Sequence, residues 1–117
     1  MKINQVLCED AFNELRRIEN SVIDLIYMDP PFFTQDIQKL TSKDKNIEYT
    51  FPDKWDSMDD YLQFMKDRLV ECRRVLKDTG SIFVHSDRNA SHYLKVLMDK
   101  IFGMNSFQSE IIWSYKR

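Results

Sequence analysis

The stretch from Val22 to Phe32 joins an apolar run to a turn through which no strand can continue. The run is rich in Val, Ile and Leu, which is typical of a strand covered on both faces, as in a parallel sheet. Pro30 and Pro31 have no backbone N–H to donate, so the hydrogen-bonded ladder has to stop there. We therefore expect Asp29 at the carboxyl end of a buried strand, where open α/β sheets bind their ligands.

The turn carries groups that suit chemistry on the exocyclic amine of a nucleobase. Such an amine is a poor nucleophile, because its lone pair is delocalised into the ring. The Asp29 carboxylate and the preorganised Pro30 carbonyl could both accept hydrogen bonds from the NH2 group and free that lone pair. Phe32 supplies a flat face on which an extruded base could stack. The simpler interpretation is a strand followed by a rigid turn with a surface carboxylate.

The sequence Asp29-Pro30-Pro31-Phe32 resembles the catalytic motif of DNA amino-methyltransferases, which transfer a methyl group from S-adenosylmethionine to adenine N6 or cytosine N4. Residues 80–87 and 110–117 support this resemblance. Their order is similar to that of the class in which the catalytic motif precedes the cofactor motif. Aspartate rather than serine before the prolines is similar to the adenine-N6 branch. The chain thus looks like the N-terminal part of an adenine-N6 DNA methyltransferase.

This resemblance implies an α/β fold over residues 1–117, a partial Rossmann-like methyltransferase domain with a mostly parallel sheet and flanking helices. It implies methyl transfer from S-adenosylmethionine to a flipped base, with Asp29, Pro30, Pro31 and Phe32 as the catalytic residues. Double-stranded DNA is the implied partner, and a second copy of the chain and a restriction subunit are further candidates. No membrane partner is expected, and the implied location is cytoplasmic.

The cofactor site is expected to lie largely outside this chain. Gly80 and Gly103 are the only glycines, and neither has a second glycine near enough to form a nucleotide-binding loop. In the class resembled, a Phe-x-Gly-x-Gly loop and a target-recognition region follow later, and the sequence contains neither. We therefore expect a fragment that is inactive alone. Asp10 is first of all a good helix N-cap, and the resemblance also makes it a candidate cofactor-binding residue.

Four further residues are candidates for contact with the base or the DNA. His85 ends a second apolar strand pattern, so it could orient the base or line the cofactor pocket, although a hydrogen-bonded structural histidine is the commoner case. Phe33 follows the catalytic motif, and Lys116 and Arg117 form a basic pair at the end of the chain. The net charge of −2 means that DNA contacts depend on such local groups or on missing parts.

Periodicity predicts the remaining elements. A polar stretch at 33–56 is expected to be a long loop, which could form a lid over the base, a wall against DNA, or a disordered segment, with Phe51 and Trp55 pinning its far end. Ser57 and Gly80 are expected to begin and end one long helix, and Asp87 to cap the next. We expect strands at 2–8, 22–28, 81–85 and 109–117, and helices at 9–19, from 57 to about 76, and at 89–102.

Other chemistries receive less support from the sequence. Cys8 and Cys72 lie far apart, which suits a reducing compartment, and neither belongs to a metal-binding or nucleophilic Pro-Cys pattern. No apolar run reaches membrane-spanning length. Two alternatives stay open: a methyltransferase that acts on RNA or on a protein amide, and a non-enzymatic α/β interaction module.

Overall fold

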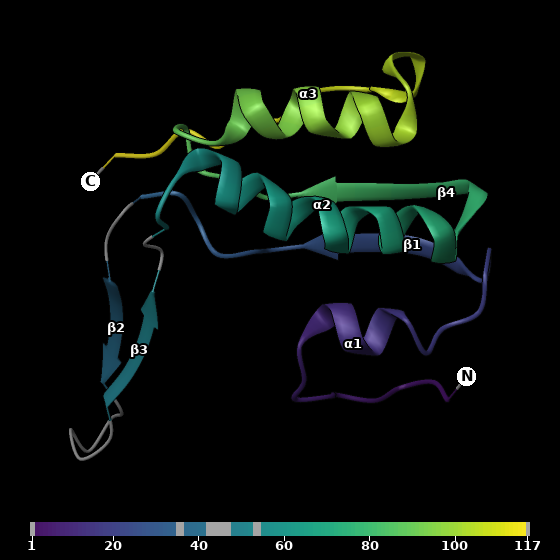
Figure 1. Cartoon of the computed structure of the whole chain (residues 1–117), viewed down its shortest axis with the longest axis horizontal. Coiled ribbons are helices and arrows are strands. Elements are labelled where there is room, and N and C mark those ends of the chain that lie inside the picture. Colours follow the sequence, from purple (N-terminus) through teal and green to yellow (C-terminus); the bar gives the residue numbers. More distant parts are fainter. Residues whose placement is uncertain (1, 35–36, 42–47, 53–54, 117) are drawn as a thin grey trace.

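The computed structural model describes residues 2–34, 37–41, 48–52 and 55–116. Helices pack beside a parallel strand pair, and a separate antiparallel hairpin follows the first strand (Figure 1). This arrangement confirms the predicted partial Rossmann-like α/β fold. In chain order the elements are α1 (Ala11–Leu15), β1 (Ile23–Met28), β2 (Ile37–Thr41), β3 (Glu48–Pro52), α2 (Met58–Val75), β4 (Leu76–Val84), α3 (Ser91–Phe102) and a 3₁₀ turn, η1 (Met104–Ser106).

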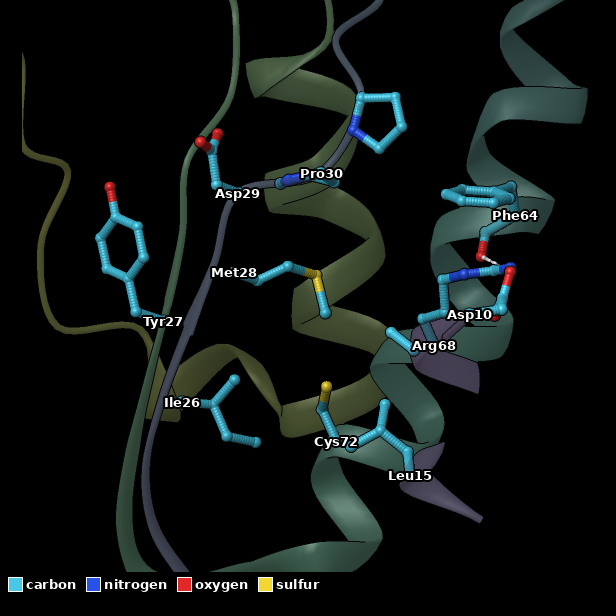
Figure 2. Close-up of a pocket in the computed structure, with 12 residues that line it drawn as sticks. Asp10, Leu15, Ile26, Tyr27, Met28, Asp29, Pro30, Phe64, Arg68 and Cys72 are labelled. Carbon is cyan, nitrogen blue, oxygen red and sulfur yellow. Dashed lines mark hydrogen bonds and ion pairs between the residues drawn. The ribbon is translucent and has the colours of Figure 1, made fainter. Parts of the chain in front are cut away.

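β1 and β4 form the parallel pair, aligned from Leu25 opposite Ser81 to Met28 opposite Val84. Their carboxyl ends therefore meet at the same edge of the sheet. Only one face of β1 is covered: Figure 2 shows Ile26 and Met28 pointing toward α2. The prediction of a strand buried on both faces is wrong for the described residues, because Leu25 and Tyr27 on the other face are 61% and 68% exposed.

The junction between α2 and β4 differs from the prediction that Gly80 ends the helix. The helix ends at Val75, and Leu76 already has extended backbone angles (φ −76°, ψ 134°) and begins β4. Gly80 lies inside this strand, where a Cβ atom would be 2.7 Å from Leu76 Cδ1 and 3.0 Å from the Asp24 carbonyl oxygen. Glycine is thus needed for a close approach of two strands at an irregular part of their pairing, not for a helix end.

α2 and α3 carry most of the core. Ser57 caps α2 by accepting a hydrogen bond from the Asp60 N–H, as predicted. Gly103 ends α3 with φ at 93°, which is also as predicted. The α3 helix begins two residues later than expected, after a turn at 88–90. The central cluster of buried side chains consists of Tyr61, Met65, Leu69, Ala90, Leu94 and Ile101.

Several predicted elements are absent or shorter. Residues 2–8 form no strand, and residues 109–116 adopt no regular secondary structure and pair with no described strand. Ile112 and Trp113 in this last segment are each 80% exposed. The helix expected at 9–19 is confined to Ala11–Leu15. An isolated strand cannot satisfy its backbone groups without a neighbour, and apolar alternation does not show whether a neighbour exists.

The polar stretch at 33–56 is not a simple loop, because β2 and β3 pair within it as an antiparallel hairpin. Residues 35–36, 42–47 and 53–54, together with the side chain of Phe51, lie outside the described part of the chain. Trp55 does contact the core as expected, with its ring centroid 5.2 Å from that of Tyr61 and 4.9 Å from that of Phe64. No helix in the described ranges is both long and apolar enough to cross a membrane.

Candidate functional site

The candidate site lies where β1 and β4 end. Asp29 follows β1 and His85 follows β4, and the His85 backbone N–H donates to the Met28 carbonyl at 2.8 Å. This bond extends the parallel ladder by one step beyond Val84 and sets the two side chains beside each other. Asp29 Oδ1 lies 3.6 Å from His85 Nδ1. The Phe32 ring lies 5.3 Å from the imidazole, centroid to centroid.

The proline turn is held by two aromatic side chains that donate hydrogen bonds. The Tyr61 hydroxyl on α2 donates to the Pro31 carbonyl at 3.0 Å, and the Trp55 indole N–H donates to the Phe32 carbonyl at 3.3 Å. Tyr61 is fully buried, so its hydroxyl needs such an acceptor. The rigid φ of the prolines and these two donors together fix the path of the backbone.

The segment after β4 holds the far side of the turn. The Asp87 carboxylate accepts a hydrogen bond from the Phe33 N–H at 3.0 Å and another from the Asn89 N–H at 2.9 Å. The Asn89 amide donates to the Phe33 carbonyl at 3.3 Å. The Phe33 ring packs against Tyr61 with centroids 5.6 Å apart. The predicted substrate-contact residue Phe33 therefore lies against the core, with both of its backbone groups bonded.

Two acceptors of the turn stay available. Among the residues that the structure describes, none donates a hydrogen bond to the Pro30 carbonyl. The Asp29 side chain is 65% exposed. A carboxylate and an adjacent carbonyl, on a backbone fixed by its neighbours, form a preorganised pair of acceptors for an NH2 group.

A cavity of about 430 Å³ connects this turn to Asp10 (Figure 2). Asp29 and Pro30 lie at one end, and Phe64, Arg68 and Cys72 of α2 form a wall. Burial raises the pKa of the Cys72 thiol to about 11, so this wall carries an uncharged thiol at neutral pH. The volume is that of a small-molecule site.

Asp10 has both carboxylate oxygens engaged within the chain. Oδ1 accepts the Phe12 N–H at 2.8 Å, which confirms the predicted N-cap, and Oδ2 pairs with Arg68 at 2.7 Å. The hydrogen bond from Arg68, then that from the Phe12 backbone, holds the pKa of Asp10 below its usual value. Arg68 is itself fixed, since its guanidinium lies 3.5 Å from the centre of the Phe64 ring.

Of the basic pair predicted at the end of the chain, the structure describes only Lys116, which is not joined to the site. Lys116 is exposed, and within the described residues no hydrogen bond or ion pair links it to the turn. Arg117 lies outside the described residues. Sequence reasoning missed the side chains that hold the turn and the partner of Asp10. Trp55 was predicted only to pin the end of the polar stretch and Asp87 only to cap a helix, and no role at the site was predicted for Tyr61, Asn89 or Arg68.

Comparison with known proteins identifies relatives for nearly the whole chain. A family model described as "DNA methylase" matches residues 23–117. The type II methyltransferase M.HinfI of Haemophilus influenzae is 39% identical over 70% of this chain and 24% of its own length. The Mod subunit of the type III restriction-modification enzyme StyLTI of Salmonella typhimurium is 31% identical over 97% of this chain and 21% of its own length. The chain thus spans less than a quarter of either relative.

Proposed function

Because the chain belongs to the DNA methylase family, we propose that it supplies the catalytic turn of an enzyme that methylates an exocyclic amine in DNA, with adenine N6 as the target. The observation that carries this proposal is the pair of available acceptors, Asp29 and the Pro30 carbonyl, on a turn whose Pro31 and Phe32 carbonyls and following Phe33 N–H are bonded. The names of the relatives support it. M.HinfI is a methyltransferase, and a protein 28% identical over 91% of this chain, YhdJ of Escherichia coli, is named a DNA adenine methyltransferase.

In this proposal the two hydrogens of the amine point at different acceptors. One donates to the Asp29 carboxylate and the other to the Pro30 carbonyl. With both hydrogens held, the nitrogen lone pair is turned out of conjugation with the base and toward the donor methyl group. Phe32, whose ring is only partly buried, stacks on the base. The protein therefore acts by orienting the amine, and the positions of both acceptors are set before the base arrives.

The methyl donor of the proposed reaction is S-adenosylmethionine, which supplies an electrophilic methyl group. The cavity beside Asp29 has room for part of such a ligand, but the acid at its other end is already paired: both oxygens of Asp10 are bonded, to Phe12 and Arg68. Neither Gly80 nor Gly103 lines this cavity, so no glycine allows a close backbone approach there. The described residues do not hold the donor by themselves, and we propose that a longer protein completes the site.

The proposal is tested by methyl transfer in the complete protein that carries this chain. Tritiated S-adenosylmethionine and duplex DNA are the substrates, and mass spectrometry of the digested nucleosides distinguishes N6-methyladenine from N4-methylcytosine. Asp29→Asn keeps the shape but turns one acceptor oxygen into a donor, so the transfer rate is expected to fall by about 100-fold or more. Asp24→Asn is the matched control, because Asp24 lies on β1, the strand that Asp29 follows, is 80% exposed and, within the described residues, pairs only with Lys77.

Asp24→Asn is expected to retain the rate of the unchanged protein. Loss of activity in both variants would point to a general effect of charge on β1, and full activity in Asp29→Asn would refute the proposed role of the carboxylate. If the methyl groups were recovered only in N4-methylcytosine, the proposed mechanism would stand and the target base would be cytosine instead of adenine.

A further inference from the structure

The environment of His85 shows that its side chain is directed at the catalytic turn. Its backbone is fixed by the hydrogen bond to Met28 at 2.8 Å, and its ring is 5.3 Å from the Phe32 ring. One nitrogen, Nδ1, faces two oxygens at once: Tyr27 Oη at 3.4 Å and Asp29 Oδ1 at 3.6 Å. A histidine with a packing role alone would not need its Nδ1 to face both a hydroxyl and a carboxylate.

The charge of Asp29 decides which tautomer of His85 fits this arrangement. An ionised carboxylate only accepts hydrogen bonds, so a bare Nδ1 lone pair would face the lone pairs of Oδ1. A proton on Nδ1 removes this repulsion and gives Asp29 a donor. Tyr27 Oη, at 3.4 Å, can accept from this N–H or donate to an unprotonated Nδ1, so the carboxylate is the group that favours a proton on Nδ1. The other charged group nearby, Asp87, does not compete, since its carboxylate accepts from the Phe33 and Asn89 N–H groups.

We propose that His85 is a positioning residue for the methyl-transfer reaction, acting through Asp29. Nδ1 faces Asp29 Oδ1 at 3.6 Å, which is longer than an ordinary hydrogen bond, and its N–H closes onto the carboxylate in the complex with DNA, holding it in one rotamer with Oδ2 directed at the amine. A carboxylate that is 65% exposed would otherwise sample several rotamers, which differ in where they place its free oxygen. The role of His85 in methyl transfer rests on the proposed function of the turn, whereas the contact between His85 and Asp29 does not.

The first measurement therefore does not depend on methyl transfer by the protein. Nitrogen-15 NMR of the imidazole in the 117-residue chain, at about pH 8.5 where an ordinary imidazole is neutral, reports which ring nitrogen carries the proton. We expect His85 to carry it mainly on Nδ1, and this preference to be lost in Asp29→Asn. His92 provides the internal control, because it is exposed on α3 and its tautomer should not respond to Asp29.

The second measurement is single-turnover methyl transfer by the complete protein, with donor and DNA affinities determined separately. His85→Ala is expected to slow transfer by about ten-fold with both affinities unchanged, which corresponds to one hydrogen bond to a charged group. His85→Asn, whose amide nitrogen lies near the position of Nδ1, should restore most of the rate. His92→Ala should leave the rate unchanged.

A double-mutant cycle distinguishes positioning of Asp29 from a structural role. In an Asp29→Asn background, His85→Ala should have no further effect, because there is no carboxylate left to hold. An additional ten-fold loss there, or a proton on Nε2 in the unchanged chain, would overturn the inference. If the unchanged complete protein transferred no methyl group to DNA, the proposed function would fail, and the NMR measurement would still decide whether His85 donates to Asp29.

Discussion

At the scale of single residues, the site is built from side chains that donate to backbone carbonyls. Tyr61 and Trp55 each end in one N–H or O–H group, and each uses it on the proline turn. The Asp29-Pro30-Pro31-Phe32 motif could be read from the sequence because its chemistry is local. These two donors could not, since the sequence shows only that they are large and amphipathic, and their acceptors lie 30 and 23 positions away.

Asp10 gives a prediction for the dependence of stability on pH. Its folded-state pKa is lowered by Arg68 and the Phe12 N–H, so its contribution is present above the unfolded pKa of about 4 and is lost as the pH falls through the folded value. Asp10→Asn keeps the helix cap and removes the ion pair. We expect the unchanged chain to be the more stable by a small margin at about pH 6, and the difference to shrink as the pH falls below about 4.

Urea unfolding of the unchanged chain and of the Asp10→Asn variant across this pH range measures the difference in their free energies of unfolding. A difference that stayed constant down to about pH 3 would show that the ion pair with Arg68 is not its source. Arg68→Gln offers a check, because it removes the same pair from the other side and should give the same loss of pH dependence.

At the scale of elements, α2 organises the molecule, with α1 on one side, α3 on the other and β4 directly after it. Arg74 near its end joins α1 to this frame: its guanidinium donates to the carbonyls of Leu15 and Ile18, each at 2.8 Å. Arg74 lies in the last turn of α2, where a positive charge complements the helix dipole. The structure shows that it also satisfies carbonyls at the end of α1, a helix too short to be stable without such partners.

Arg74→Ala should therefore detach the end of α1. We expect the free energy of unfolding to fall by about 2 kcal/mol, because two carbonyls lose a charged donor. Lys77→Ala is the control, since Lys77 lies three residues later and makes only an exposed pair with Asp24, so it should change stability by less than about 0.5 kcal/mol. Guanidinium unfolding followed by circular dichroism checks both, and equal losses in the two variants would contradict the role of Arg74.

The helix α2 and the strands expected at 22–28 and 81–85 were predicted correctly, the strands being found as β1 and β4, whereas the strands expected at the two ends of the chain were not found among the described residues. α2 has a capping residue and an apolar face over five turns, so its existence follows from its own residues. The strands expected at 2–8 and 109–117 have the right composition but pair with no described strand. The early start of β4 at Leu76 depends on pairing with Ile23, more than fifty residues away, and local helical periodicity concealed it.

At the scale of the whole molecule, the described sheet has one parallel pair and one open face, and Asp10, one of the two acids that line the cavity beside the turn, is already paired. The 117-residue chain is therefore expected to bind S-adenosylmethionine too weakly to detect. A calorimetric titration of the chain with millimolar S-adenosylmethionine should give no heat beyond the heat of dilution. The same titration of the Asp10→Asn variant is run for comparison. Clear binding to the unchanged chain would show that these residues build a donor pocket without a glycine loop.

The way the turn is held has a consequence for how this chain can change over evolutionary time. Pro31, Phe32 and Phe33 give their backbone groups to Tyr61, Trp55, Asp87 and Asn89, side chains contributed by separate parts of the fold. A substitution that reshapes the turn also leaves buried donors without acceptors. Selection for folding and selection for chemistry then act on the same positions. New target preferences would have to arise around the turn, while the turn itself is inherited unchanged.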